Sequence, residues 1–318
     1  MKLSRLVGFA GLFLLVPTLV ACSVETSGDE TTDETVAAEV TTTTEAAAFP
    51  VTVGDLTLDA EPQRIVSMSA TATEMLFAIG AGEKVIAVDN FSNYPAQTVE
   101  LEKVDAYQPN VEAISALEPD LVIISYDPGN LVEQLNALSI PVFSAYAVSN
   151  LDGAYEQLEQ LGALTGRLAE AVQLSATMQA EIAEIVAGVT KTEPPLTYFY
   201  ELDPTLYSIT SNTFVGGVMA SLGLVSVADG VEAGNDYPQL SAEVLVDKDP
   251  SIIFLADTKC CAQSLQTVAE RDGWAELTAV KTGSVVELDD DIASRWGPRL
   301  VDLVRVVAEA VASVLAKQ

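Results

Sequence analysis

Short apolar runs alternate with amphipathic segments along most of the chain. The runs are rich in Val, Ile and Leu and end at turn residues, which is typical of strands buried on both faces. We predict strands at residues 64–69, 84–88, 121–125, 141–145, 196–200, 252–255 and 285–288. Helical patterns separate them at residues 71–79, 112–117, 131–138 and 214–222. This alternation predicts parallel sheets with helices on their faces, and therefore an α/β fold class.

The first of these helices carries both a start and a stop signal. Thr71 and Glu74 have the spacing of a capping box, in which two side chains satisfy free backbone N–H groups at a helix N-terminus. Gly80 and Gly82 follow the apolar stretch and would end the helix. We therefore expect a short capped helix directly after the first strand.

The segment 151–189 differs from the rest, because it contains no Pro and no strand pattern. Apolar residues recur in it at steps of three to four, which predicts two helices broken near Thr165 and Gly166. The second, from about Arg167, would be long and would lie in the middle of the chain. A further amphipathic helix is predicted at residues 297–316.

These elements predict two α/β lobes, each with a parallel sheet, joined by a single long backbone helix. The N-terminal lobe would span residues 49–150 and the C-terminal lobe residues 191–318. Linker helices at 151–190, which include the backbone helix, would connect them. One helical connector restricts the motion of two lobes more than several flexible crossings would, so we expect a clamp with small closure.

The two predicted lobes share an internal repeat. Each has an aromatic residue, a loop, a Glu, a short helix, and a Pro that opens an apolar strand, with the same spacing from Glu to Pro. The corresponding residues are Tyr107, Glu112 and Pro119 in the first half and Tyr237, Glu243 and Pro250 in the second. Such a repeat indicates pseudo-symmetric lobes.

Glu112 and Glu243 have two interpretations. Each follows a suitable N-cap residue by two positions, and a carboxylate there stabilises the helix dipole. The functional interpretation is a matched pair of exposed acids, one on each lobe, that grips two equivalent basic sites on a symmetric dimer. Both interpretations can hold at once.

The chain begins with the pattern of an export signal. A short cationic start precedes an apolar run at 6–20, which is too short to span a bilayer because a spanning helix needs about 20 apolar residues. Small residues then precede Cys22, as a lipoprotein signal peptidase requires. We predict a lipoprotein signal peptide at 1–21 and lipidation of Cys22, with an ordinary signal and a chance Cys as the alternative. Residues 22–48 are rich in Thr and Glu and predict a disordered tether.

Charge and composition narrow the classes of function. The chain has 46 Asp and Glu against 15 Lys and Arg, which argues against nucleic acid and anionic membrane surfaces as partners. It has no His, so Ser-His-Asp and Cys-His catalysis and imidazole metal sites are excluded. We expect no catalytic residue and no metal site. The adjacent Cys260 and Cys261 lack the spacing of a metal site and are either a structural pair or a feature near the ligand.

Aromatic residues gather in the loops that follow the predicted strands. They are Phe91, Tyr94, Tyr107, Tyr126, Tyr200, Tyr207, Tyr237 and Trp296. Ligands of open α/β sheets bind beyond the carboxyl ends of the strands, and aromatic faces there suit a large, flat, partly apolar ligand. The alternative is that several of these rings pack in the core. Arg295 likewise either contacts a polar group of the ligand or pairs with the acidic run at 289–291.

Three motifs carry a resemblance to a known family. They are the segment 64–95, the Glu-x6-Pro-Asp-Leu entry to the strand at 121, and Arg-x-Gly-Pro-Arg at 295–299. Together they resemble the helical-backbone substrate-binding proteins of importers for iron–siderophores, haem and cobalamin, and among these the cobalamin-binding branch. The resemblance covers the chain from about residue 51 to its C-terminus. It implies two α/β lobes bridged by one long helix, with the ligand between them.

The resemblance also implies roles for single residues. Glu112 and Glu243 occupy motif positions that meet permease arginines in cobalamin binders, and Phe91, Tyr107 and Tyr237 fall at or near positions of aromatic ligand contacts. One departure is that Ser125 and Tyr126 stand where the family has a Trp. Phenol side chains thus replace indole side chains. Because Tyr can ligate ferric iron, an iron chelate remains an alternative ligand. Haem bound through His is excluded.

We therefore predict an extracytoplasmic lipoprotein, anchored to the outer face of the cell membrane, that serves an ABC importer. It would capture a metal-chelate nutrient, cobalamin or another corrinoid, and deliver it to the permease dimer. The ligand would carry the metal, so no resident cofactor is expected. The predicted ligand-binding residues are Phe91, Tyr107, Tyr126, Tyr200, Tyr207, Tyr237, Arg295 and Trp296. The alternative ligands are a ferric siderophore or haem, and the alternative of a different class is a chelatase-like enzyme.

Overall fold

A computed structural model describes residues 49–317. The predicted signal peptide at 1–21, the lipidation of Cys22 and the tether at 22–48 lie outside the described residues. Among the described residues, no helix is long and apolar enough to cross a membrane.

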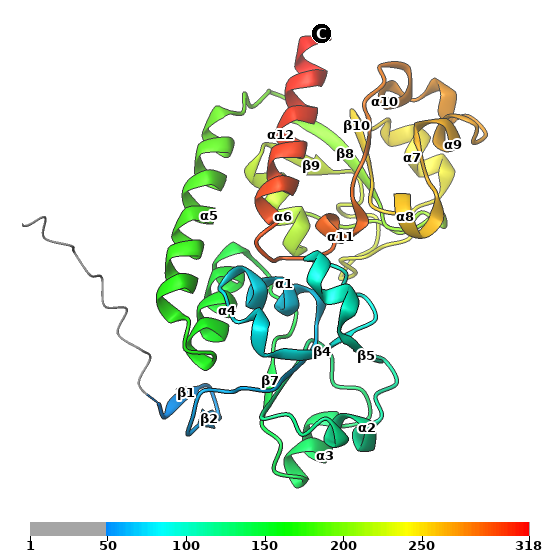
Figure 1. Cartoon of the computed structure of the whole chain (residues 1–318). Helices are drawn as coiled ribbons and strands as arrows, with labels where there is room; N and C mark the ends of the chain where they lie inside the picture. Colours follow the sequence, from blue (N-terminus) through cyan, green and yellow to red (C-terminus); the bar gives the residue numbers. More distant parts are fainter. Residues whose placement is uncertain (1–48, 318) are drawn as a thin grey trace, which may run out of the picture. The chain divides into compact units, whose positions relative to one another are not determined.

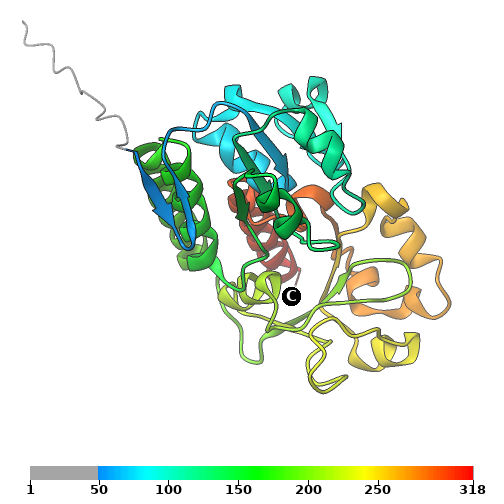
Figure 2. The same ribbon diagram turned by 90° about the horizontal axis from the view of Figure 1, so that it is seen from below.

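The N-terminal lobe is built on a five-stranded parallel sheet with the strand order β5-β4-β3-β6-β7. The strands are β3 (Ile65–Met68), β4 (Val85–Asp89), β5 (Glu102–Val104), β6 (Leu121–Ile124) and β7 (Val142–Ser144). The helices between them are α1 (Ala70–Ala78), α2 (Val111–Ala116) and α3 (Leu131–Ala137). An antiparallel hairpin of β1 (Val51–Val53) and β2 (Leu56–Leu58) precedes the sheet and lies beside the green helices in Figure 2.

The C-terminal lobe is built on a four-stranded parallel sheet with the order β11-β10-β8-β9. The strands are β8 (Leu196–Glu201), β9 (Leu224–Ser226), β10 (Ile252–Leu255) and β11 (Val285–Glu287). The helices are α6 (Phe214–Ser221), α7 (Ala242–Lys248), α8 (Thr258–Cys261), α9 (Leu265–Ala269), α10 (Thr278–Lys281) and α11 (Asp290–Ala293).

The predicted repeat is visible in the topology of the two sheets. In the N-terminal sheet β3 lies between β4 and β6, and in the C-terminal sheet β8 lies between β9 and β10. The helix that carries the repeated Glu directly precedes one of these neighbours, α2 before β6 and α7 before β10. The equal Glu-to-Pro spacing therefore marks the same helix–strand unit twice.

Two helices connect the lobes, as the sequence predicted. They are α4 (Leu151–Leu164) and α5 (Leu168–Gly188), and the break between them lies at Gly166, whose φ of +71° suits a residue without a Cβ. The long α5 runs beside the C-terminal helix α12 (Leu300–Ala316) (Figure 1). The lower end of α5 in this view lies by the N-terminal lobe and its upper end by the C-terminal lobe.

The strands are continuous apolar runs in the sequence because hydrophobic clusters cover both faces of the sheets. Successive side chains of a strand point to opposite faces of the sheet. In β8, Tyr198 and Tyr200 enter a cluster shared with α4, α5, α12 and the N-terminal sheet, whereas Phe199 enters a separate cluster under α7 and α9. A third cluster packs under α2 and α3. The two lobes thus share one continuous hydrophobic cluster, which favours limited motion between them.

The predicted capping box at Thr71 and Glu74 is wrong. Ser69 is the N-cap of α1, and its side chain accepts the backbone N–H of Ala72. The helix therefore begins before Thr71, and Glu74 lies inside it, where its carboxylate binds arginines from the far end of the chain. The polar residue that directly follows β3 takes the capping role, so the local four-residue pattern was misleading.

Four short strands were not predicted, namely β1, β2, β5 and β9. Each has three residues, which is too few for an apolar run to stand out, and β5 and β9 lie at sheet edges where charges and exposure are tolerated. The last helix begins at Leu300 rather than at 297, because the Gly-Pro turn at 297–298 separates it from Arg295.

Candidate functional site

A cavity of about 600 Å³ lies between the two lobes. Its walls are the segments that follow β3, β4, β5 and β6 in the N-terminal lobe and β10 and β11 in the C-terminal lobe. The carboxyl ends of parallel strands are where open α/β sheets bind ligands. The cavity therefore lies where the sequence predicted a binding site.

Three aromatic residues form what we call the aromatic wall of the cavity: Phe91, Tyr107 and Tyr126. The rings of Phe91 and Tyr107 meet edge to face, with centroids 5.6 Å apart, and those of Tyr107 and Tyr126 lie 6.2 Å apart. All three are more than half exposed, Tyr107 at 64%. Neighbouring exposed rings in a concave site offer an apolar surface for a ligand to cover.

Local turn chemistry holds two of these rings in place. Asp89, the last residue of β4, accepts the backbone N–H groups of Phe91 at 2.8 Å and Ser92 at 2.7 Å. Asp105 does the same for Tyr107 at 2.8 Å and Gln108 at 2.9 Å. An Asp side chain that bonds to the backbone two and three residues ahead fixes a turn. Each ring thus follows a strand by a short, locked turn.

Opposite lobes are joined by a buried ion-pair network centred on Glu74 of α1. Arg295 Nη1 donates to Glu74 Oε1 at 2.7 Å, and Arg299 donates to both Glu74 oxygens at 2.6 and 2.9 Å. The Glu74 side chain is 1% exposed and that of Arg295 is 8% exposed. The hydrogen bonds from Arg299 to Glu74 raise the pKa of Arg299, and its guanidinium also stacks over the ring of Tyr94 at 4.3 Å.

Arg295 does more than join the lobes. Its Nη2 donates to the carbonyl oxygen of Phe91 at 2.8 Å and to Asp291 at 2.6 Å, and its Nη1 reaches Asn93 at 3.1 Å. Although Arg295 lines the cavity, these bonds occupy its guanidinium. The prediction that Arg295 contacts the ligand is therefore not supported, and the alternative of an ion pair with the run at 289–291 is confirmed at Asp291.

The C-terminal side of the cavity is charged, and we call Lys259, Asp290 and Asp291 the charged wall. Lys259 Nζ donates to Asp289 and to Asp291, each at 2.7 Å. Burial alone would raise the pKa of Asp291. Hydrogen bonds from Lys259 and Asn93, together with the charge of Arg295, outweigh that effect and hold the pKa below its ordinary value.

Trp296 lines the cavity beside Arg295. Its Nε1 donates to Gln157 Oε1 at 2.8 Å, and Gln157, on α4, donates in turn to the carbonyl oxygen of Tyr146 at 2.9 Å. The linker helices therefore help to orient a cavity residue. Phe91, Tyr107, Tyr126 and Trp296 are thus brought together as predicted.

Three other predicted tyrosines do not line the cavity. Tyr200 is 1% exposed, and its hydroxyl donates to the carbonyl oxygen of Ala293 at 3.0 Å, so it is a core residue. The alternation of β8 turns it toward the shared cluster, and its prediction as a ligand contact is wrong. Tyr207 and Tyr237 are exposed, yet they lie in loops after β8 and β9 outside the cavity lining.

Glu112 and Glu243 are exposed in the first turns of α2 and α7. Asn110 and Ser241 cap these helices by accepting backbone N–H groups three residues ahead. The predicted N-caps are confirmed, and both carboxylates lie where a negative charge complements the helix dipole. The interpretation as docking residues stays a prediction.

Several residues of the site were missed from the sequence. Glu74 was assigned to a cap, and Asn93 and Lys259 were given no cavity role, whereas for Cys260 the alternative of a feature near the ligand agrees with its place in the cavity lining. The Asp-x-aromatic pattern at Asp89 and Asp105 was an available signal for the aromatic wall. For Glu74 no local signal exists, because both of its partners lie more than 200 positions away along the chain.

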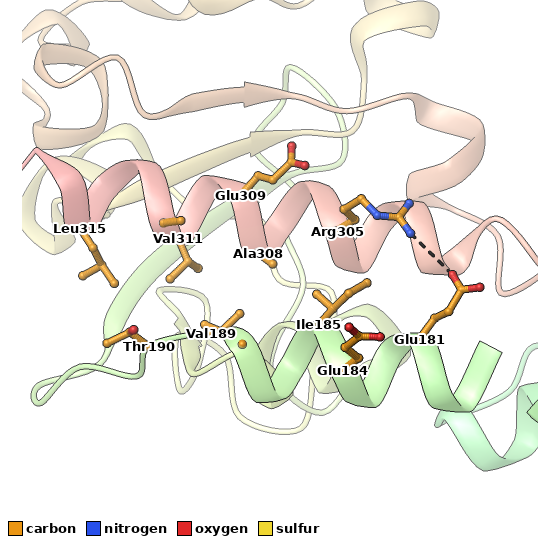
Figure 3. A pocket seen from close by; sticks show the side chains of 12 residues that line it. Glu181, Glu184, Ile185, Val189, Thr190, Arg305, Ala308, Glu309, Val311 and Leu315 are labelled. Carbon is orange, nitrogen blue, oxygen red and sulfur yellow. Dashed lines mark ion pairs between the residues drawn. The ribbon is translucent and has the colours of Figure 1, made fainter. Parts of the chain in front are cut away.

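A second hollow, of about 680 Å³, lies between the C-terminal halves of α5 and α12 (Figure 3). Its floor is apolar, with Ile185 and Val311 among the lining residues, and the pair Arg305–Glu181 closes one end at 3.6 Å. No strand end and no aromatic ring contributes to it. Despite its larger volume, this groove lacks the features of a site for a flat ligand.

A family model described as periplasmic binding protein matches residues 65–292. The chain belongs to this family. A cobalamin-binding protein of Halobacterium salinarum is 32% identical over 278 residues, covering 83% of this chain and 75% of the relative. An uncharacterized ABC transporter substrate-binding lipoprotein of Bacillus subtilis, YvrC, is 29% identical over 276 residues, covering 83% and 86%.

Among solved structures, the periplasmic vitamin B12 binding protein BtuF of Vibrio cholerae matches with a TM-score of 0.67 at 28% identity. The match covers 81% of this chain and 99% of that chain. These comparisons confirm the resemblance and the α/β binding-protein fold predicted from the sequence. The family is one of substrate-binding proteins rather than of enzymes.

Proposed function

We propose that this protein captures a corrinoid, cobalamin above others, in the cavity between its lobes and delivers it to an ABC importer. The observation that carries the proposal is the aromatic wall at the strand ends. Three neighbouring rings, two of them held by the turns at Asp89 and Asp105, face a cavity of about 600 Å³ in a chain related to a cobalamin-binding protein. A macrocycle with a broad apolar face would cover these rings.

The charged wall and Trp296 would contact the polar rim of the ligand. A corrinoid carries amide groups around its ring, and these both donate and accept hydrogen bonds. Lys259 and the carboxylates of Asp290 and Asp291 offer both kinds of partner. The metal would arrive within the ligand, so no protein side chain needs to hold it.

Delivery requires a permease and a place near the membrane. Glu112 and Glu243, exposed at equivalent places on the two lobes, would bind basic residues of a permease dimer. Lipid on Cys22 would hold the protein at the outer face of the cell membrane, which is consistent with a relative named as a lipoprotein.

An iron chelate is the second candidate ligand. Tyr107 and Tyr126 expose phenol groups in the cavity, and a phenolate is a ligand for ferric iron. Haem or a ferric siderophore would then use the same cavity. The two candidates differ in whether a phenol oxygen must bind the metal.

Isothermal titration calorimetry of residues 49–318 against cobalamin, cobinamide, haem and a set of ferric siderophores tests the proposal. Sub-micromolar binding of a corrinoid alone supports it. If only an iron chelate binds, the protein is still a binding protein that uses this cavity, but the assignment of a corrinoid as its ligand is wrong. Tyr107→Phe separates the two, since it keeps the ring and removes the phenol oxygen.

A further inference from the structure

Two adjacent cysteines lie on the short helix α8, which contributes to the wall of the cavity. Cys260 is exposed and lines the cavity, and Cys261 is half-buried beside it. Both are free thiols. The proposed function uses neither of them, and their place in the wall of the site calls for an explanation.

The turn that carries the cysteines has weak internal support. Two long hydrogen bonds close it, from the backbone N–H groups of Cys261 and Gln263 to the carbonyl oxygen of Asp257 at 3.2 and 3.4 Å. Asp257 precedes the helix but does not cap it, and within residues 49–317 its buried carboxylate oxygens have no hydrogen-bond partner. The turn ends at Ala262 with a φ of +56°, a left-handed conformation that strains a residue with a Cβ.

External contacts hold the turn in its helical form and link it to the cavity. Asp290 accepts the backbone N–H groups of Lys259 and Cys260 at 3.0 and 2.9 Å. The Lys259 side chain binds Asp291, which also accepts Arg295, the residue that holds the Phe91 loop. A change in α8 would therefore reach the aromatic wall through two ion pairs.

We propose that Cys260 and Cys261 are a redox-sensitive pair that closes into a vicinal disulfide, unwinds α8 and loosens the charged wall of the cavity. Neighbouring side chains of a helix diverge by about 100°, whereas a disulfide requires the two Cβ atoms to approach within about 4.5 Å. The dithiol therefore fits the helical turn, and the disulfide does not. The consequence for ligand affinity rests on the proposed function, but the closure of the ring does not.

The oxidant is a small-molecule disulfide. The thiolate of one cysteine attacks a sulfur of that disulfide, which forms a mixed disulfide and releases one small thiol. The second cysteine then attacks the sulfur of the first, which forms the vicinal bond and releases the other small thiol. The protein loses two protons and two electrons, and the small disulfide gains them as it becomes two thiols.

The groups around Cys260 determine the rate of this thiol–disulfide exchange. Burial, the neighbouring Cys261 and the charges of Asp290 and Asp257 raise the pKa of Cys260 to about 12. The thiolate is the reactive form, so exchange should be slow at neutral pH and should speed up as the pH rises. The negative charges of Asp290 and Asp257 do not stabilise the thiolate of Cys260. They therefore do not stabilise the reduced pair relative to the disulfide.

Peptide mass spectrometry of the full chain tests ring closure. The protein is incubated with hydroxyethyl disulfide, its remaining thiols are alkylated, and the tryptic peptide from Cys260 to Arg271 is weighed. We expect this peptide to resist alkylation and to be lighter than the reduced peptide by two hydrogen atoms. A peptide that is still fully alkylated, or one that retains a small thiol as a mixed disulfide, would overturn the proposal.

Hydrogen exchange tests the structural consequence. In the oxidised protein, the amides of residues 258–261 should exchange faster than in the reduced protein, because the bonds to Asp257 and Asp290 are lost. The matched control is Cys261→Ser exposed to the same disulfide, in which no ring can form and exchange should stay slow. Ring closure without faster exchange would contradict the unwinding of α8.

Calorimetry of the reduced and oxidised proteins with cobalamin tests the effect on the cavity. We expect several-fold weaker binding after oxidation. Equal affinity of the two forms would remove the link to the cavity. If neither form binds cobalamin, the proposed function fails, while the mass and exchange results still decide whether the pair is a redox-sensitive element.

Discussion

The two walls of the cavity differ in their chemistry, because one consists of aromatic side chains and the other of charged ones. The aromatic wall of the N-terminal lobe consists of three contacting rings, each placed two or three residues beyond a strand. The charged wall of the C-terminal lobe consists of Lys259, Asp290 and Asp291, and Lys259 forms ion pairs with Asp291 and with the neighbouring Asp289. Both walls stand at the carboxyl ends of parallel strands, so the same topology carries two different surfaces.

This difference separates recognition from positioning. The rings of the aromatic wall are more than half exposed, so most of their surface is free to contact a ligand. The charges of the opposite side mostly satisfy one another, and through Arg295 and Glu74 they fix where the first wall stands. We infer that the aromatic wall supplies affinity and that the ion pairs supply geometry.

Removing the centre of the network should produce the largest effect. Glu74→Ala leaves two arginines in a buried site without their carboxylate, and we expect the free energy of unfolding to fall by about 3–5 kcal/mol. Urea unfolding followed by circular dichroism measures the change. Glu181→Ala is the control, because it removes one half-exposed ion pair and should cost about 1 kcal/mol or less. Equal losses in the two variants would show that the network does not brace the lobes.

Removing the middle ring of the aromatic wall comes next. Tyr107 touches both other rings, so Tyr107→Ala opens the wall at its centre. We expect corrinoid binding to weaken by about 2 kcal/mol, close to thirtyfold, with the stability nearly unchanged because the side chain is exposed. Tyr237→Ala is the matched control, an exposed tyrosine outside the cavity. Calorimetry in which both variants lose affinity alike would move the site toward Tyr237.

The two walls also differ in how far the sequence predicts them. The rings of Phe91 and Tyr126 follow predicted apolar strands, so the α/β pattern alone places them at one edge of a sheet, whereas Tyr107 follows β5, which the sequence did not predict. Tyr200 also belongs to a predicted apolar strand, but its side chain points into the core. Whether a strand side chain is buried depends on which layer covers that face of the sheet. Glu74 depends on contacts with Arg295 and Arg299, and no local pattern encodes a contact at such separation. The sheets, the long helix and the repeat were predictable for the same reason as the rings.

Two carboxylates near the charged wall should respond to pH in opposite directions. Asp291 has a lowered pKa, so its contribution to stability is present above the unfolded value and is lost as the pH falls through the folded one. For Asp257, burial and the charge of Glu201 raise the pKa to about 7. Its contribution is present below its unfolded pKa and is lost as the pH rises toward 7.

Asp257→Asn removes this second titration. We expect the variant to gain stability relative to the wild type progressively between pH 4 and pH 7, with no further gain above. Thermal unfolding at a series of pH values measures the difference. Asp247→Asn, an exposed carboxylate on α7, should show no such trend. A constant difference between Asp257→Asn and the wild type at all pH values would mean that Asp257 stays charged in the folded protein.

The smallest effects on stability and binding are expected outside both walls. Glu112→Ala with Glu243→Ala removes one first-turn carboxylate from each lobe, at a cost of about 0.5 kcal/mol per helix, and should leave corrinoid affinity unchanged. Transport into vesicles that contain the permease should nevertheless fall strongly, since both docking points are lost. Glu133→Ala is the control, because it removes an equivalent exposed carboxylate from the first turn of α3. Full transport by the double variant would leave Glu112 and Glu243 as helix-stabilising residues alone.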